Sequence, residues 1–318
     1  MKNKLIILFV ITLVSSCYNS DSEQTIIQDT GINNKIILVA DSTLFNSALA
    51  DTIKQIFEKK IVGVFPEEKM FNVKFIERKV FDNNNIFKKE KNIIIISESK
   101  DDFIEDKWDK NQAVVYLNLN SKFSVFAKKA REAFKFINQK ELTSIFNDHY
   151  YNHNEKATKD IFNKFGIEIF VPNEYNQFIN DETVCLAKYH ASNQDEDLFK
   201  YLIVFEELPP EYMMSKLIEY DSNYDESWIS MQVNAILQNY VWGASEGSYA
   251  KTDQEFSLIF ENDIYQGMWH LVNDFGGGPI IVKTRKNRIN NKRTIIIGLI
   301  YYPSGDTRKL LRTFEALF

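Results

Sequence analysis

Short, continuous apolar runs place the strongest constraint on how this chain folds. They lie in the first half, at Ile36 to Ala40, Asn92 to Ile96 and Ala113 to Leu119, and polar residues bound each of them. Such a run suits a strand in a sheet whose two faces are both covered, because neither face of the strand presents polar side chains to water. Each run therefore predicts a buried strand.

Apolar residues at helical spacing separate these strands. One stripe runs from Phe45 to Phe57 and another from Phe123 to Ile137, followed by a further helical stretch to about Lys164. Asn72 to Ile76 alternates between polar and apolar residues and predicts one more strand. Strand and helix signals thus alternate over residues 35–164, which predicts an N-terminal α/β layer domain.

Gly166 and Pro172 mark the boundary that we expect between two domains. Gly166 ends the helical stretch, and Pro172 ends an apolar strand over Ile167 to Val171. Over residues 165–318 we expect further strands at 183–189, 201–206, 255–260, 267–272, 279–284 and 294–302. Helices are expected over 225–240, with Asp225 as N-cap, and over 306–317. The chain is therefore predicted to be α+β, with two α/β layer domains, the second an antiparallel sheet packed with helices as a sandwich.

The first sixteen residues have the layout of a secretory signal peptide. Lys2 and Lys4 precede an apolar run from Leu5 to Val14, which is about half the roughly twenty residues that a membrane-spanning helix needs. The sequence Leu-Val-Ser-Ser-Cys that ends at Cys17 resembles the lipobox of bacterial lipoproteins. That resemblance implies cleavage before Cys17 and attachment of lipid, palmitate included, to this residue. In the alternative interpretation, Cys17 is an incidental thiol beside an ordinary cleavage site.

Residues 17–34 are polar and predict a flexible tether between the lipidated cysteine and the folded part. Within it, Ser-Asp-Ser-Glu at residues 20–23 resembles the acidic surface-export tags of some lipoproteins. We therefore expect a protein of the cell envelope, held through a lipid on the outer membrane, on its periplasmic or its surface face.

Charge and cysteine content exclude two other classes. Removal of the signal takes away Lys2 and Lys4, which leaves 36 of the 38 basic side chains against 44 acidic ones and a formal charge of −8 in place of −6. We therefore expect no nucleic-acid partner. Cys185 is the one cysteine left after lipidation, so an intramolecular disulfide is not possible and stability depends on the core.

Two motifs raise enzymatic or metal-binding hypotheses. Gly243 to Gly247 fits the pattern GxSxG, in which Ser245 would be a nucleophile, but a helix precedes it and a strand follows, the reverse of a nucleophile elbow. The alternative is a glycine-bearing helix exit. His149 and His153 have the spacing of two metal ligands on a helix, or they lie on a solvated helix face. We assign no catalytic residue, no metal site and no cofactor.

Two loops and a basic segment remain as candidate binding features. The first loop contains Ser245, Glu246, Ser248 and Tyr249, and the second contains Asp274, Gly276, Gly277 and Gly278, with Trp269 in the strand before it. Three consecutive glycines cost conformational entropy, so they serve either a ligand loop or a tight hairpin. A basic hairpin comprises Lys283, Arg285, Lys286, Arg288, Lys292 and Arg293. The two interpretations of this hairpin are a contact with anionic lipid or polysaccharide and a solvated hairpin tip.

The order of these pieces resembles a family of uncharacterised lipoproteins from Bacteroidota. The resemblance is carried by the lipobox, by the sequence SEGSY at residues 245–249, by Gly-Met-Trp at 267–269 and by the GGP motif within 276–279. It implies an envelope lipoprotein and brings no known activity. The sequence thus predicts a membrane-anchored, non-enzymatic module that binds a protein, glycan or lipid partner; the alternatives are a serine hydrolase using Ser245 and a metal-binding protein.

Overall fold

The computed structural model describes residues 34–192, 197–217, 227–253, 258–261, 264–287 and 290–318. The predicted signal peptide, Cys17 and most of the tether lie outside these residues, as do Asp225 and Arg288. Residues 31–318 form one compact unit. None of the helices within the described residues is both long enough and apolar enough to span a membrane.

The first sheet has five strands in the order β2-β1-β3-β5-β4. The pairs β1–β2, β1–β3 and β3–β5 are parallel, and β4 pairs with β5 in the antiparallel direction. The three continuous apolar runs form three of these strands, as predicted, and the structure adds β4. The bounds are β1 Lys35–Ala40, β2 Asn72–Glu77, β3 Asn92–Ser97, β4 Asp102–Glu105 and β5 Ala113–Asn118.

Helices cover this sheet on both faces, which explains the apolar runs. On one face, α2 (Ala48–Phe57) and α4 (Phe123–Tyr151) pack buried apolar residues against alternate residues of the strands. On the other face, α3 (Arg78–Asn83) contributes Phe81 to a smaller core. Short 3₁₀ turns at Ser42–Leu44 and Phe87–Lys89 complete this part.

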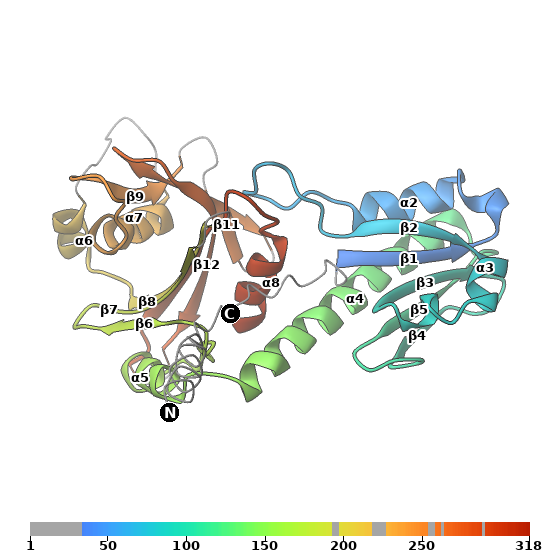
Figure 1. Ribbon diagram of the computed structural model, residues 1–318, viewed down its shortest axis with the longest axis horizontal. Helices are drawn as coiled ribbons and strands as arrows, with labels where there is room; N and C mark the ends of the chain where they lie inside the picture. Colours follow the sequence, from blue (N-terminus) through green and yellow to red (C-terminus); the bar gives the residue numbers. More distant parts are fainter. Residues whose placement is uncertain (1–33, 193–196, 218–226, 254–257, 262–263, 288–289) are drawn as a thin grey trace, which may run out of the picture. The chain divides into compact units, whose positions relative to one another are not determined.

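The second sheet has eight strands, and every strand pair in it is antiparallel. Its order is β10-β11-β12-β13-β8-β7-β6, with β9 paired to β11. Figure 1 labels β6, β7, β8, β9, β11 and β12 of this sheet. The bounds are β6 Gln177–Asn180, β7 Val184–Ser192, β8 Asp197–Glu206, β9 Tyr249–Thr252, β10 Ile259–Glu261, β11 Ile264–Val272, β12 Gly277–Lys286 and β13 Arg293–Tyr301.

This sheet also lies between two helical layers. Buried residues of α5 (Glu155–Phe165) and α8 (Arg308–Leu317) share a core with one face, and those of α6 (Pro210–Lys216) and α7 (Trp228–Tyr240) share a core with the other. The prediction of an α+β chain whose second part is an antiparallel sheet sandwiched by helices is therefore confirmed.

One predicted strand is wrong. Gly166 ends α5 in the left-handed conformation, as expected, but Ile167 to Val171 do not form a strand. The backbone N–H of Val171 donates to the hydroxyl of Thr158 at 3.1 Å, and its carbonyl accepts from the N–H of Asn154 at 2.7 Å. Because α5 satisfies these groups, the segment is buried without a place in the sheet. The N-cap of α7 is likewise Ser227 rather than Asp225.

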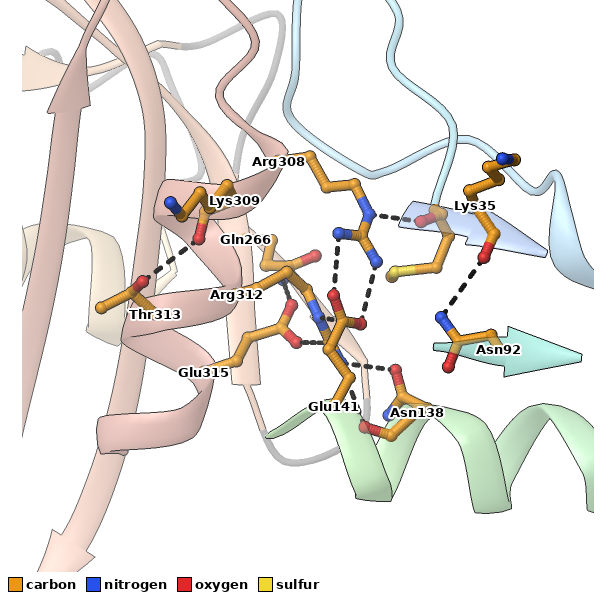
Figure 2. Close-up of polar contacts among 11 residues, drawn as sticks. Lys35, Asn92, Asn138, Glu141, Gln266, Arg308, Lys309, Arg312, Thr313 and Glu315 are labelled. Atoms are coloured by element: carbon orange, nitrogen blue, oxygen red, sulfur yellow. Dashed lines mark hydrogen bonds and ion pairs between the residues drawn. The ribbon is translucent and has the colours of Figure 1, made fainter. Parts of the chain in front are cut away.

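A cluster of buried charges joins α4 to α8. Glu141 of α4 accepts two hydrogen bonds from the guanidinium of Arg308, each 2.9 Å long, and its Oε2 lies 3.3 Å from Nε of Arg312 (Figure 2). Arg312 also pairs with Glu315 and donates to the side chain of Asn138. The side chains of Glu141, Arg308 and Arg312 are 5%, 3% and 2% exposed, so the cluster is shielded from water. We name it the charge cluster.

The loop between α2 and β2 packs beside the start of α8. Ile61 and Val64 from this loop lie in a core of the second sheet. Glu68 accepts hydrogen bonds from the N–H and the hydroxyl of Thr307, both at 2.8 Å, and from the N–H of Arg308 at 2.7 Å. Burial, together with a hydrogen bond to Asp306, raises the pKa of Glu68 to about 7. Glu68 therefore holds a proton at mildly acidic pH.

Replacement of Glu141 by alanine tests the energetic weight of the charge cluster. The change leaves two buried guanidinium groups without their shared carboxylate, and we expect it to lower the free energy of unfolding by about 3–5 kcal/mol. Glu105, which pairs with Lys140 of the same helix and is 59% exposed, is the matched control. Its replacement should cost less than about 1 kcal/mol. Urea denaturation measures both, and equal losses would contradict a special role for Glu141.

The raised pKa of Glu68 predicts a pH-dependent stability. From pH 4.5, its ordinary pKa, to about 7, the folded chain holds a proton that the unfolded chain has released. The stability from this site is therefore largest at low pH and is lost as the pH rises to about 7. Urea midpoints between about pH 5 and about pH 8 should change less in Glu68→Gln, which stays neutral, than in the native chain. Glu67→Gln, at an exposed neighbour, should retain the native profile, and a native profile in Glu68→Gln would refute the assignment.

Candidate functional site

Two loops of the second sheet lie against each other and form the candidate site. The first, residues 242–248, leads from the end of α7 into β9. The second, residues 273–276, is the turn between β11 and β12. We call them the paired loops. The two candidate loops predicted from the sequence overlap the paired loops, so the predicted loops lie next to each other in the structure.

Asp274 joins the paired loops. Its Oδ2 accepts a hydrogen bond from the backbone N–H of Ser245 at 2.9 Å, and its Oδ1 accepts one from the N–H of Phe275 at 2.7 Å. Hydrogen bonds, from Ser245 first and from Phe275 next, lower the pKa of the Asp274 carboxyl. The carboxylate is therefore charged at neutral pH and holds the two loops together.

Gly243 allows this close approach. A Cβ atom at this position would lie 2.2 Å from Oδ2 of Asp274 and 2.9 Å from Cδ1 of Leu271. The first loop is also braced internally, because the N–H of Gly243 donates to the hydroxyl of Ser248 at 2.9 Å. The contact between the paired loops thus requires a residue without a side chain at position 243.

Two large aromatic side chains protrude from the paired loops. Phe275 is 97% exposed and Trp242 is 59% exposed, and each adjoins one of the two residues, Asp274 and Gly243, that bring the loops together. The indole N–H of Trp242 donates to the carbonyl of Gln238, so its orientation is partly fixed. Polar residues of the same loops, Glu246 and Asn273 among them, are also exposed. The paired loops thus expose both apolar and polar side chains, the mixed composition of a protein interface.

Several residues predicted for the site belong instead to the core beneath it. Ser248, Tyr249 and Trp269 are buried, and the indole N–H of Trp269 donates to the carbonyl of Ile300 at 3.1 Å. Among the predicted residues, Ser245 and Glu246 are exposed. The sequence interpretation did not select Trp242 and Phe275, although an aromatic residue within a turn of Asp and Gly is a signal of exposure.

The glycine run serves a hairpin. Gly276 has φ +151°, and its carbonyl accepts from the N–H of Leu271. A Cβ atom at Gly277 would lie 2.6 Å from the carbonyl oxygen of Trp269, and one at Gly278 would lie 2.3 Å from that of Ile300. The close neighbours of these glycines are therefore strands of the same sheet.

The geometry around Ser245 differs from that of a serine hydrolase. The backbone and the side chain of Ser245 both bond to Asp274, whereas a catalytic serine bonds to a histidine base. His270 has Nδ1 3.4 Å from the carboxylate of Asp253. The order α7, loop, β9 is also the reverse of a nucleophile elbow, as the sequence indicated.

The two histidines considered for a metal do not share a helix face. α4 ends at Tyr151, so His149 lies on the helix and His153 lies beyond it, where Nδ1 contacts the carbonyl of Tyr150 at 2.8 Å. Burial lowers the pKa of His149. Within the described ranges, no group of three or more His, Cys, Asp or Glu side chains is placed to hold a metal ion. Cys185 is buried, and burial raises its pKa to about 11, which disfavours the reactive thiolate form at neutral pH.

Comparison with known families divides the chain near α5. Residues 154–318, just over half of the chain, match the family described as a domain of unknown function, DUF4837. The chain belongs to the DUF4837 family. Residues 29–159 match a second family described as a domain of unknown function, DUF8532. Neither the curated proteins nor the solved structures contain a significant match.

The paired loops lie entirely within the DUF4837 segment, together with all strands of the second sheet. The DUF8532 segment contains the first sheet and the whole of α4. Neither description assigns an activity, so the function of this DUF4837 protein has to be inferred from its own surface.

Proposed function

We propose that this chain is a cell-envelope lipoprotein that is anchored through Cys17 and binds a partner through the paired loops, without catalysing a reaction. The exposure of Trp242 and Phe275 on loops that Asp274 holds together is the observation that carries the binding role. The lipobox resemblance carries the anchor. We also propose that the chain belongs to the family of Bacteroidota lipoproteins and that its lipid is inserted in the outer membrane.

Exposed aromatic side chains favour binding for an energetic reason. An exposed Trp or Phe side chain contributes little hydrophobic free energy while it is in water. Its burial against a partner contributes roughly 25 cal/mol of favourable free energy for each Å² of apolar surface removed from water. The hydrogen bonds of Asp274 and Ser248 fix the loop backbone beforehand, so less conformational entropy is lost on association. The paired loops therefore combine contact area with rigidity.

A protein partner fits this surface better than a glycan or a lipid. Aromatic anchors within a polar rim are the usual composition of protein–protein hot spots. Glu246, which is exposed beside Ser245, disfavours contact with anionic lipid. Glycan or lipid binding would appear as distinct outcomes of the experiment on Phe275 below.

The anchor is tested by the incorporation of labelled palmitate into the chain in cells. We expect Cys17→Ala to abolish the label, because no other residue of the lipobox carries a thiol. Cys185→Ala, which removes the second of the two cysteines, is the matched control and should retain it. Label that persists in Cys17→Ala would exclude this residue as the lipidation site.

The recognition surface is tested by a photocrosslinking residue, p-benzoylphenylalanine, introduced at position 275 in cells. We expect a discrete adduct with an envelope protein, and no such adduct from position 86, where Ile86 is 71% exposed on a different part of the chain. With that partner purified, Phe275→Ala should weaken its binding about 30-fold, the effect of losing a hot-spot residue.

Asp274→Ala should reduce the same adduct, because the paired loops lose their connection while the photocrosslinking residue at position 275 remains. Adducts with lipid or glycan alone would contradict a protein partner. Equal adducts from positions 275 and 86 would contradict a recognition role for the paired loops altogether.

A further inference from the structure

A basic hollow lies at the end of the hairpin formed by β12 and β13. It has a volume of about 460 Å³ and is lined by Glu207, Thr284, Arg285, Lys286, Asn291, Lys292 and Arg293. Four of these residues are basic and one is acidic, although the chain as a whole carries a net charge of −6. The hollow is therefore a local reversal of the charge of the protein.

This hollow is separate from the paired loops. β12 begins beside them at Gly277 and ends in the hollow at Lys286. Since each strand residue advances the chain by about 3.3 Å, the two features lie roughly 30 Å apart. A ligand in the hollow would therefore leave the paired loops free.

Two cationic side chains lie next to each other in the hollow, on the neighbouring strands β12 and β13. Lys286 is the direct register partner of Arg293, and directly paired residues of antiparallel strands project from the same face. Like charges in such positions destabilise the sheet. Local conflicts of this kind are expected at functional or strained sites.

The nearby carboxylates do not neutralise this pair completely. Arg293 lies 3.5 Å from Glu207, which also accepts the indole N–H of Trp228. Glu206 accepts from Lys292 at 2.9 Å and from the amide groups of the hairpin. In the part of the chain that the structure describes, Lys286 has no carboxylate partner, and its side chain is exposed.

We propose that the hollow binds a phosphate monoester, with Lys286 and Arg293 as the principal cationic contacts. A phosphate monoester carries nearly two negative charges at neutral pH and offers three acceptor oxygens, which matches two adjacent cations. The fork of a guanidinium suits phosphate in particular. Thr284 and Asn291 add neutral donors in the lining. The volume also has room for a small group esterified to the phosphate, such as glycerol or a sugar.

The test measures the thermal midpoint of the full chain with inorganic phosphate, glycerol 3-phosphate and dihexanoyl phosphatidic acid, each against sodium chloride of equal ionic strength. We expect a rise with at least one phosphate compound that chloride does not reproduce. Lys286→Gln should lower the affinity of the chain for that compound about tenfold. Lys156→Gln, at an exposed lysine on α5, should leave this affinity unchanged.

The midpoint without ligand separates binding from a structural role. Because Lys286 opposes Arg293, Lys286→Gln should leave this midpoint unchanged or raise it. A response to all three compounds identifies the phosphate itself as the determinant, and a response to dihexanoyl phosphatidic acid alone identifies a lipid headgroup. No rise beyond that of chloride, or an equal rise in Lys286→Gln, would overturn the proposal.

Discussion

The carboxylate of Glu141, held between the guanidinium groups of Arg308 and Arg312, is the interaction on which the arrangement of the described chain depends. Charges that are almost completely removed from water are tolerated only when their partners and their geometry are satisfied. α4 therefore has to bring Glu141 to one place on α8. Because α8 also contributes Leu311, Phe314 and Leu317 to a core of the second sheet, that core and the charge cluster are formed together.

The second sheet carries two surfaces of opposite chemistry at the two ends of β12. The paired loops present aromatic side chains on a backbone braced by one carboxylate, whereas the hollow presents mainly basic side chains. A rigid strand within a buried sheet keeps such surfaces at a constant separation. The two proposed binding surfaces, one for a macromolecular partner and one for a small anion, therefore do not overlap.

Local patterns predicted much of the fold because their causes are local. A continuous run such as Asn92 to Ile96 predicts a strand covered on both faces, and a glycine such as Gly166 predicts a helix end, whatever lies elsewhere in the chain. Ile167 to Val171 have the composition of a strand but lie outside the sheet, because Thr158 and Asn154 satisfy polar groups of its backbone. Competition for hydrogen-bond partners is decided by the neighbours in space.

The sequence by itself determined the α+β class, most of the strands, and the likeness of Cys17 and its flanks to a lipobox. The tertiary structure decided which residues meet. Glu141 follows Ile137 by one helical turn on the buried face of α4, which marks it as unusual, but its partner Arg308 lies 167 residues away. Ser245 and Asp274 are 29 residues apart, and the exposed Phe275 adjoins their contact. Long-range pairing of polar groups depends on how whole layers pack, and no local spacing in the chain encodes it.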